Sequence, residues 1–157
     1  MGIDEDALNL MVHFSSGHPT MMQEIGAGIY WTCDDKNISC RDAFIGIVRS
    51  GEEIGVKYLK SSLDSSFRSN KYLNIFNKLG EDFITNFNGE YSFKKKDFVS
   101  QLDENESKVF SDFLIRARQL GILEFSGAKK SGHYKFTNNL FPLYFAIKSF
   151  ESNNLVI

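Results

Sequence analysis

The stretch from Phe93 to Thr137 constrains the fold of this chain more than any other part of it. Apolar residues recur there at spacings of three and four, which predicts one buried face of a long helix. They are Val109, Phe110, Phe113, Leu114, Ala117 and Leu120. Asn105 is a suitable N-cap for this helix, and Gly121 is placed to end it. A shorter helix, Lys94 to Leu102, is predicted before it.

Two β-prone segments follow the long helix, Ile122 to Phe125 and Tyr134 to Thr137. The loop SGAKKSG between them has glycine near both ends and predicts a hairpin. A helix-turn-helix followed by a hairpin is typical of a winged helix, a fold that most often contacts DNA. Upstream, Phe67 to Phe83 predicts a packing helix, and Tyr91 to Phe93 a short strand.

The first part of the chain predicts three helices, at Asp4 to Ser15, Thr20 to Thr32 and Cys40 to Leu59. Gly26 and Gly28 lie inside the second helix, where each costs about 1 kcal/mol relative to alanine. We therefore expect a close helix–helix approach there. The serine-rich segment KSSLDSSFRSN predicts a boundary. The expected fold class is mainly α with a small β-wing: a helical bundle (1–62), then a winged helix-turn-helix domain with a C-terminal helix (63–157).

The charges divide unevenly along the chain. Residues 1–62 carry five Lys/Arg and nine Asp/Glu, a net −4, whereas residues 63–150 carry thirteen and ten, a net +3. This split favours an anionic partner for the second part. The apolar runs are too short for a membrane span of roughly 20 residues. The acidic start and the two cysteines, Cys33 and Cys40, lead us to expect a cytoplasmic protein without a membrane partner.

The chain begins with an acidic first helix, the turn SSGHP, the apolar helix MMQEIGAGIYW and a third helix leading into a winged helix. This order of segments resembles the C-terminal half of an AAA-type ATPase, in the archaeal and origin-recognition-like branch of the P-loop ATPases. In that family the glycine-proline turn belongs to a helical lid over the nucleotide. The resemblance implies that Gly17, His18 and Pro19 lie near the adenine.

The chain also departs from that family. The second helix has no arginine at the "sensor 2" position, and Arg41 lies on the following helix. No GxxxxGK[ST] phosphate loop occurs. The resemblance therefore implies a preceding ATPase core that supplies the site for ATP with Mg, while this chain alone has no cofactor. The alternative for the turn is a plain connection between two helices, with His18 in solvent.

Candidate DNA contacts lie on the three elements of the winged helix. On the two predicted helices they are Lys94, Lys95, Lys96, Arg116, Arg118 and Gln119, and on the hairpin Lys129, Lys130, His133 and Lys135. Arginine, lysine and glutamine suit phosphate oxygens and base edges. The alternatives are a solvated lysine cluster at the helix and a hairpin tip kept soluble by lysine.

Acidic residues argue against base reading by the long helix. Its first half carries Asp103, Glu104, Glu106 and Asp112. In this docking mode the N-terminal residues of the recognition helix meet the bases, where carboxylates would repel the phosphates.

A last helix, Asn138 to Phe150, has a wide apolar stripe that we expect to close over the core. The alternative is a surface for self-association or for a protein partner. The sequence contains no HExxH or CxxC motif and no nucleophile elbow. We expect no metal site and no catalytic residue, so the chain is not an enzyme by itself.

The expected function is that of the lid and winged helix of an ATPase, in which the lid helps to bind ATP and the winged helix binds double-stranded DNA or a protein. Two rivals remain open. One is a free-standing winged-helix transcription regulator whose first helices dimerise. The other is a protein-interaction module that does not bind nucleic acid.

Overall fold

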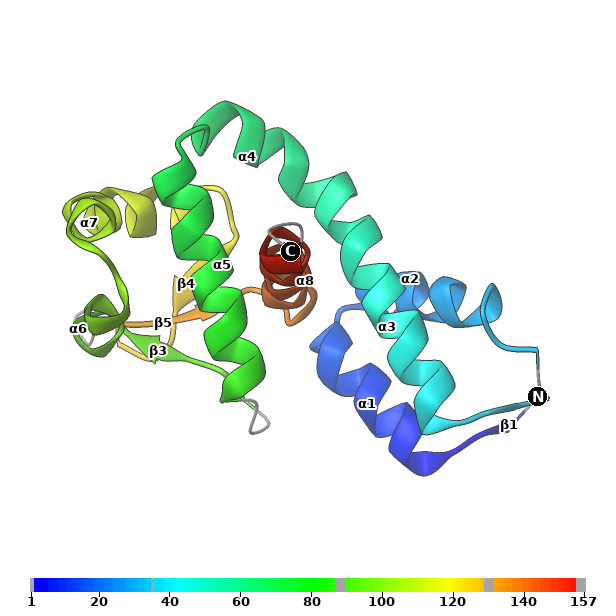
Figure 1. Ribbon diagram of the computed structural model, residues 1–157. Coiled ribbons are helices and arrows are strands. Elements are labelled where there is room, and N and C mark those ends of the chain that lie inside the picture. Colours follow the sequence, from blue (N-terminus) through cyan, green and yellow to red (C-terminus); the bar gives the residue numbers. More distant parts are fainter. Residues whose placement is uncertain (1, 35, 87–89, 129–131, 155–157) are drawn as a thin grey trace.

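The computed structural model describes residues 2–34, 36–86, 90–128 and 132–154, and these are mainly helical with a small three-stranded sheet (Figure 1). This part of the fold prediction is confirmed. The first helices are α1 (Glu5–Ser15), α2 (Pro19–Tyr30) and α3 (Cys40–Ile54). Two short parallel strands, β1 (Gly2–Ile3) and β2 (Asn37–Ile38), join the start of α1 to the start of α3.

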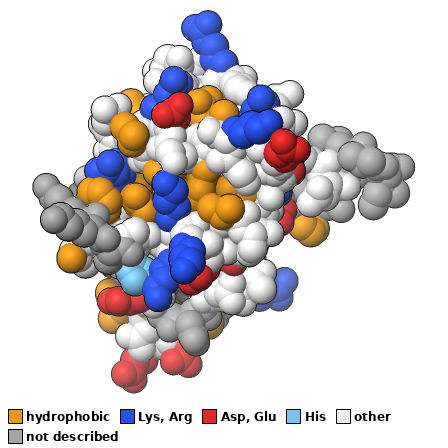
Figure 2. Space-filling view, turned by 90° about the vertical axis from the view of Figure 1, so that its left-hand side faces the viewer, with side chains coloured by type: hydrophobic (Ala, Val, Ile, Leu, Met, Phe, Trp, Pro, Cys, Tyr) orange, Lys and Arg blue, Asp and Glu red, His pale blue; other side chains and the backbone are white. Residues whose placement is uncertain are grey.

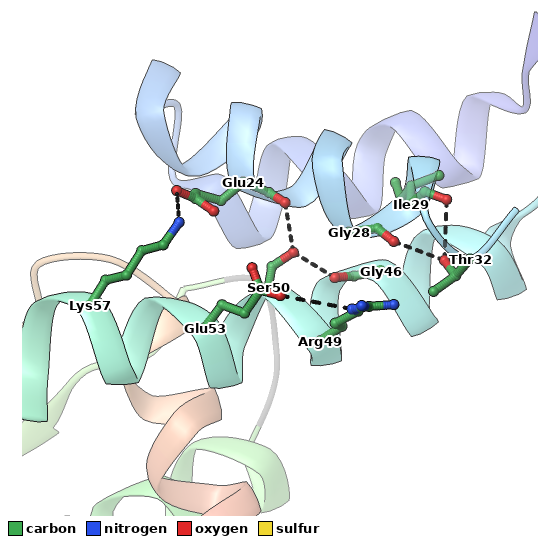
Figure 3. A network of polar contacts seen from close by, with 9 residues as sticks. All are labelled: Glu24, Gly28, Ile29, Thr32, Gly46, Arg49, Ser50, Glu53 and Lys57. Carbon is green, nitrogen blue, oxygen red and sulfur yellow. Dashed lines mark hydrogen bonds and ion pairs between the residues drawn. The ribbon is translucent and has the colours of Figure 1, made fainter.

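Helices α2 and α3 touch through their backbones. A Cβ atom on Gly28 would lie 2.6 Å from the carbonyl oxygen of Gly46, so only glycine fits there. The Ser50 hydroxyl lies beside this contact and donates to the Glu24 carbonyl oxygen at 2.9 Å (Figure 3). The predicted close approach is confirmed at Gly28 but is wrong at Gly26, whose Cβ would meet no atom within 4 Å.

The serine-rich segment predicted as a boundary is largely helical. Helix α3 continues through a π-helical turn, η1 (Gly55–Leu59), into α4 (Lys60–Ser66). Two apolar side chains explain the difference, because Leu63 and Phe67 are buried and the polar residues around them form the outer face of a helix. The division at residues 62 and 63 stays a prediction.

The second part of the chain builds helices around an antiparallel sheet. Its elements are α5 (Asn70–Thr85), β3 (Phe93–Lys94), α6 (Lys95–Phe98), the 3-10 turn η2 (Val99–Gln101), α7 (Glu104–Gln119), β4 (Leu123–Phe125) and β5 (His133–Phe136). Strand β5 is central, with β3 and β4 on either side. The rings of Phe93 and Phe125 flank that of Tyr134, at 5.7 and 5.4 Å between centroids.

The ends of α7 show how local sequence sets the helix limits. Asp103, not the predicted Asn105, is the N-cap: its carboxylate accepts from the Glu106 N–H at 2.7 Å. The Glu106 carboxylate accepts from the Asp103 N–H at 3.0 Å, which completes a capping box. Gly121 has a φ of +71° and follows the helix, in agreement with the predicted stop.

The last helix, α8 (Leu140–Asn154), lies between α3 and α5 (Figure 1). The Asn138 side chain accepts from the backbone N–H groups of Leu140 and Phe141 and so caps the start of the helix. Most of the predicted apolar stripe is buried, and the ring of Phe145 stacks on that of Phe76 at 4.3 Å. Phe150 is 69% exposed and lies outside this core.

Some apolar residues of the first bundle lie on its surface. Tyr30 and Trp31 were expected inside a buried helix but are 68% and 72% exposed, because α2 ends there and packs on one side only. Leu8 and Val12 of α1 are also exposed, whereas Ala7, Met11 and Phe14 form its buried face.

Replacing Gly28 with alanine should lower the free energy of unfolding by about 1–3 kcal/mol, because the new methyl group overlaps the backbone of α3. The matched control is Gly26→Ala, two residues away in the same helix. It should raise the free energy by about 0.5–1 kcal/mol, because alanine favours helix and meets no neighbour. Urea denaturation measures both. Equal effects of the two substitutions would contradict the packing described for α2 and α3.

Candidate nucleic-acid interface

Three consecutive lysines border a shallow groove between the start of α6 and the last strand. We call it the lysine groove and define it by Lys94, Lys95, Lys96, Val99, Gly132 and His133. Strand pairing builds it, because Lys94 lies opposite His133 in the β3–β5 ladder. The Lys95 N–H then donates to the Gly132 carbonyl oxygen at 2.9 Å and fixes the start of α6 against β5.

The groove lysines differ from five other lysines of the described surface, although Lys36, Lys60 and Lys71 likewise have no ion pair there. Ion pairs neutralise Lys57, Lys78, Lys108, Lys135 and Lys148, with Glu24, Glu106, Glu104, Glu124 and Glu151 respectively. Within the described ranges, none of the three groove lysines has such a carboxylate partner. The Lys95 ammonium instead donates to the Ser111 hydroxyl of α7 at 2.8 Å. The groove lysines therefore have no direct ion pair within the described residues, although carboxylates line the neighbouring hollow that Lys94 and His133 also border.

The two arginines of α7 point away from each other. Residues two apart on a helix are separated by about 200° around its axis. Arg116 donates to the Ser66 carbonyl oxygen at 3.1 Å and lies over the Tyr72 ring. The Arg118 guanidinium lies 4.1 Å from the Phe125 ring centroid, and its Nε is buried with no hydrogen-bond partner in the described structure. The two arginines thus flank the exposed face of α7 without sharing it.

Most of the acidic side chains at the start of α7 already form ion pairs or hydrogen bonds within the protein. Glu106 was expected to repel phosphates, but it is buried and pairs with Lys78 of α5 at 2.5 Å. Glu104 pairs with Lys108 at 3.1 Å, and Asp103 caps the helix. Asp112 remains exposed on the outer face. Fewer unpaired carboxylates therefore lie on the outer face of α7 than the sequence predicts.

The remaining predicted DNA contacts are on α7, on β5 and in the loop between β4 and β5. Gln119 is exposed on the outer face of α7. Lys135 lies on the same side of β5 as His133, but it faces Glu124 across the strand pair, with 3.6 Å between the charged atoms. Lys129 and Lys130 lie outside the described residues.

Figure 2 shows the molecule from the side of α6 and α7. Lys and Arg side chains spread over this face, with apolar side chains between them, and several acidic side chains lie at its lower edge. The face is therefore basic and uneven rather than one continuous positive stripe.

The turn predicted to contact a nucleotide is distant in sequence from the lysine groove. In space it lies near the end of the sheet that is away from the groove. Ser16 and Gly17 adopt left-handed backbone angles, φ 52° and 73°, and Gly17, His18 and Pro19 are exposed. The Ser16 hydroxyl accepts from the Asn139 N–H at 3.2 Å, just before α8. The turn also borders a polar cleft whose other wall includes Glu124 and Lys135.

Two ionisable side chains near this cleft have shifted pKa values. Burial lowers the pKa of His13, whose backbone carbonyl oxygen accepts from the Asn139 side chain at 2.8 Å. Burial, followed by a hydrogen bond to the Asp82 carboxylate at 2.6 Å, raises the pKa of Tyr91. His13 is thus held neutral at physiological pH, and the Tyr91 phenol remains a hydrogen-bond donor.

Three residues of the interface escaped prediction from the sequence. Ser111, Val99 and Gly132 help to shape the lysine groove. The register between β3 and β5 brings Gly132 to the lysines, and the packing of α7 brings Ser111, and such contacts between distant elements leave no local signal in a single sequence.

Lys78→Ala should lower the free energy of unfolding by about 1–3 kcal/mol, because it leaves the buried Glu106 carboxylate without its cationic partner. The Lys78 side chain is 33% exposed, which keeps the expected loss below that of a fully buried pair. Lys108→Ala is the control: it breaks the exposed pair with Glu104 and should change stability by less than about 0.5 kcal/mol. Thermal or urea denaturation compares them. Equal losses would refute the inward placement of Glu106.

Comparison with known proteins gives no match to this chain among family models, curated proteins or solved structures. In the described residues, no helix is both long and apolar enough to cross a membrane. The same residues contain no group of three or more His, Cys, Asp or Glu side chains arranged to hold a metal ion. Inferences about the function therefore rest on the sequence and the geometry of this chain.

Proposed function

We propose that this chain is the C-terminal portion of an AAA-type ATPase, and that its second part is a winged helix that binds double-stranded DNA. The observation that carries the proposal is the lysine groove, in which three consecutive lysines without an ion pair in the described structure lie between the second helix of that unit and its hairpin. The parent protein would be cytoplasmic, in keeping with Cys33 and Cys40, which are not joined in a disulfide.

The order of elements supports a winged helix. Helix α5 is followed by β3, the short helix α6, the long helix α7 and then the β4–β5 hairpin. The first strand of this series pairs with the last, so the sheet order is β3-β5-β4. In this arrangement α6 and α7 are the helix-turn-helix, α7 is the recognition helix and the hairpin is the wing.

Charge supports DNA as the partner. The second part of the chain is net positive although the whole chain is net negative. Duplex DNA is held largely by lysine and arginine contacts to phosphates, which displace counterions. Lysines without a carboxylate partner can make such contacts readily, because no internal ion pair must break first.

The lid assignment rests on the α1–α2 turn. Gly17, His18 and Pro19 are exposed, and a Cβ on Gly17 would meet no atom within 4 Å, so a preceding ATPase core has room to cover the turn. That core would supply the phosphate loop and the Mg ligands. Helix α2 contains no arginine that could reach the phosphates, so this turn could contribute only to the base end of ATP.

A protein partner is the second candidate function. The exposed face of α7 carries Ile115, which is 46% exposed, together with Asp112, and Leu120, predicted in the buried face, is 40% exposed just after the helix ends. Apolar side chains on a recognition helix suit a protein surface better than a phosphate backbone. The exposed Tyr30 and Trp31 of the first bundle likewise favour the remaining alternative, a free-standing regulator that dimerises through that bundle.

The DNA proposal predicts salt-dependent binding. A fluorescein-labelled 20-base-pair duplex should bind at low salt, and log K should fall with log salt at a slope of about −3, near −0.9 for each of three or more phosphate contacts. Fluorescence anisotropy from 20 to 300 mM salt measures the slope. Absence of binding at 20 mM salt would refute DNA as the partner and leave the protein-interaction module.

The lid proposal predicts what precedes the chain in the genome. The reading frame upstream of Met1 should encode a GxxxxGK[ST] motif, followed by an apolar strand that ends in acidic residues. Sequencing the upstream region tests this. An in-frame stop codon directly before Met1 would refute the lid assignment and would leave the DNA proposal untouched.

A further inference from the structure

We propose that the lysine groove binds a backbone phosphate of duplex DNA and that this unit holds DNA without reading its base sequence. The inference rests on the proposed DNA-binding function and goes beyond it. It assigns the main contact to the β3–α6 junction instead of the recognition helix α7.

Neighbouring elements hold the backbone of the groove in place. Strand pairing with β5 holds the backbone of Lys94, and Lys95 is held by its backbone bond to Gly132 and its side-chain bond to Ser111. Lys96 is exposed and has no ion-pair partner in the described structure. Val99 gives the groove an apolar floor between these charges. A phosphate seated there would meet several ammonium groups at once, a point-charge contact that lysine makes well.

The exposed face of α7 is poorly suited to reading bases. Its first turn offers Glu104, already paired with Lys108, and the exposed amide of Asn105. Further along, Asp112 and Ile115 present a carboxylate and an apolar group. Arg116 and Arg118 are occupied at the two flanks by Ser66 and Phe125. Gln119 lies in the last turn, whereas in this docking mode the first turns meet the bases, which leaves few base-edge donors and acceptors there.

An acidic hollow beside the groove limits where the DNA can lie. Lys94 and His133 also border a second hollow, which contains Asp82, Glu90 and Asp97. These carboxylates would repel phosphates on that side. The backbone is therefore directed over Lys96 and Val99, towards α7 and the hairpin.

The test compares two double variants that remove the same charge. Lys94→Ala with Lys96→Ala changes the groove, and Lys36→Ala with Lys60→Ala changes two exposed lysines of the first bundle and of α4. Each is titrated with the labelled 20-base-pair duplex across the salt series. Circular dichroism verifies that both variants fold. Asp97→Asn serves as the opposite change, because it removes a repelling carboxylate at the edge of the groove.

The groove variant should weaken binding at least tenfold and flatten the salt slope by about 1.8, which is 0.9 for each lost contact. The control pair should bind within threefold of the wild type, and Asp97→Asn should bind more tightly. Duplexes with permuted base sequences should bind equally.

The inference is overturned if the groove variant binds like its control, or if permuting the bases changes Kd more than tenfold. The proposed DNA-binding function survives either of these outcomes. If the wild type binds no duplex at low salt, both the inference and that function fail.

Discussion

The structure depends on α8, which fits between α3 and α5 because glycine lies at the contacts on both sides. A Cβ on Gly80 of α5 would come within 2.4 Å of the Ala146 backbone nitrogen. On the other side, a Cβ on Gly55 would overlap the Tyr144 ring, and one on Gly51 would lie 3.1 Å from Leu143. Close contact on two opposite faces lets one helix bury its stripe against both halves of the chain, so that a single hydrophobic core runs through them.

The position of α8 bears on the proposed function because this helix and the residue before it contact both the α1–α2 turn and the sheet. Asn139, directly before α8, bonds to Ser16 at the exposed turn and to His13 of α1. Phe145, in the middle of α8, packs on Phe76 of α5 and on Phe136 of β5. The turn proposed as a nucleotide lid and the sheet that borders the lysine groove therefore both contact α8 or the residue directly before it.

The sequence predicts helices well where apolar periodicity is strong, as in α5 and α7, and predicts the stop at Gly121 from backbone chemistry. It fails where two neighbouring residues compete for one role: Asp103 caps α7 instead of Asn105 because Glu106 completes its capping box. It also fails where burial depends on distant elements, as for Glu106, which pairs with Lys78, and for Trp31, which lies on the surface. At the candidate interface the sequence identifies the lysines, but not the register with β5 that places Gly132 and His133 beside them.

The central claim is that α8 makes both halves one cooperative unit, and native-state hydrogen exchange on the Gly80→Ala variant tests it most directly. The added methyl group would disturb only the α5–α8 contact, so any effect on α2 and α3 must pass through α8. We expect the exchange free energies of the most protected amides in α2, α3 and α7 to fall by the same amount. A decrease confined to α5 and α7, with α2 and α3 unchanged, would show that the two halves unfold independently and would contradict this account.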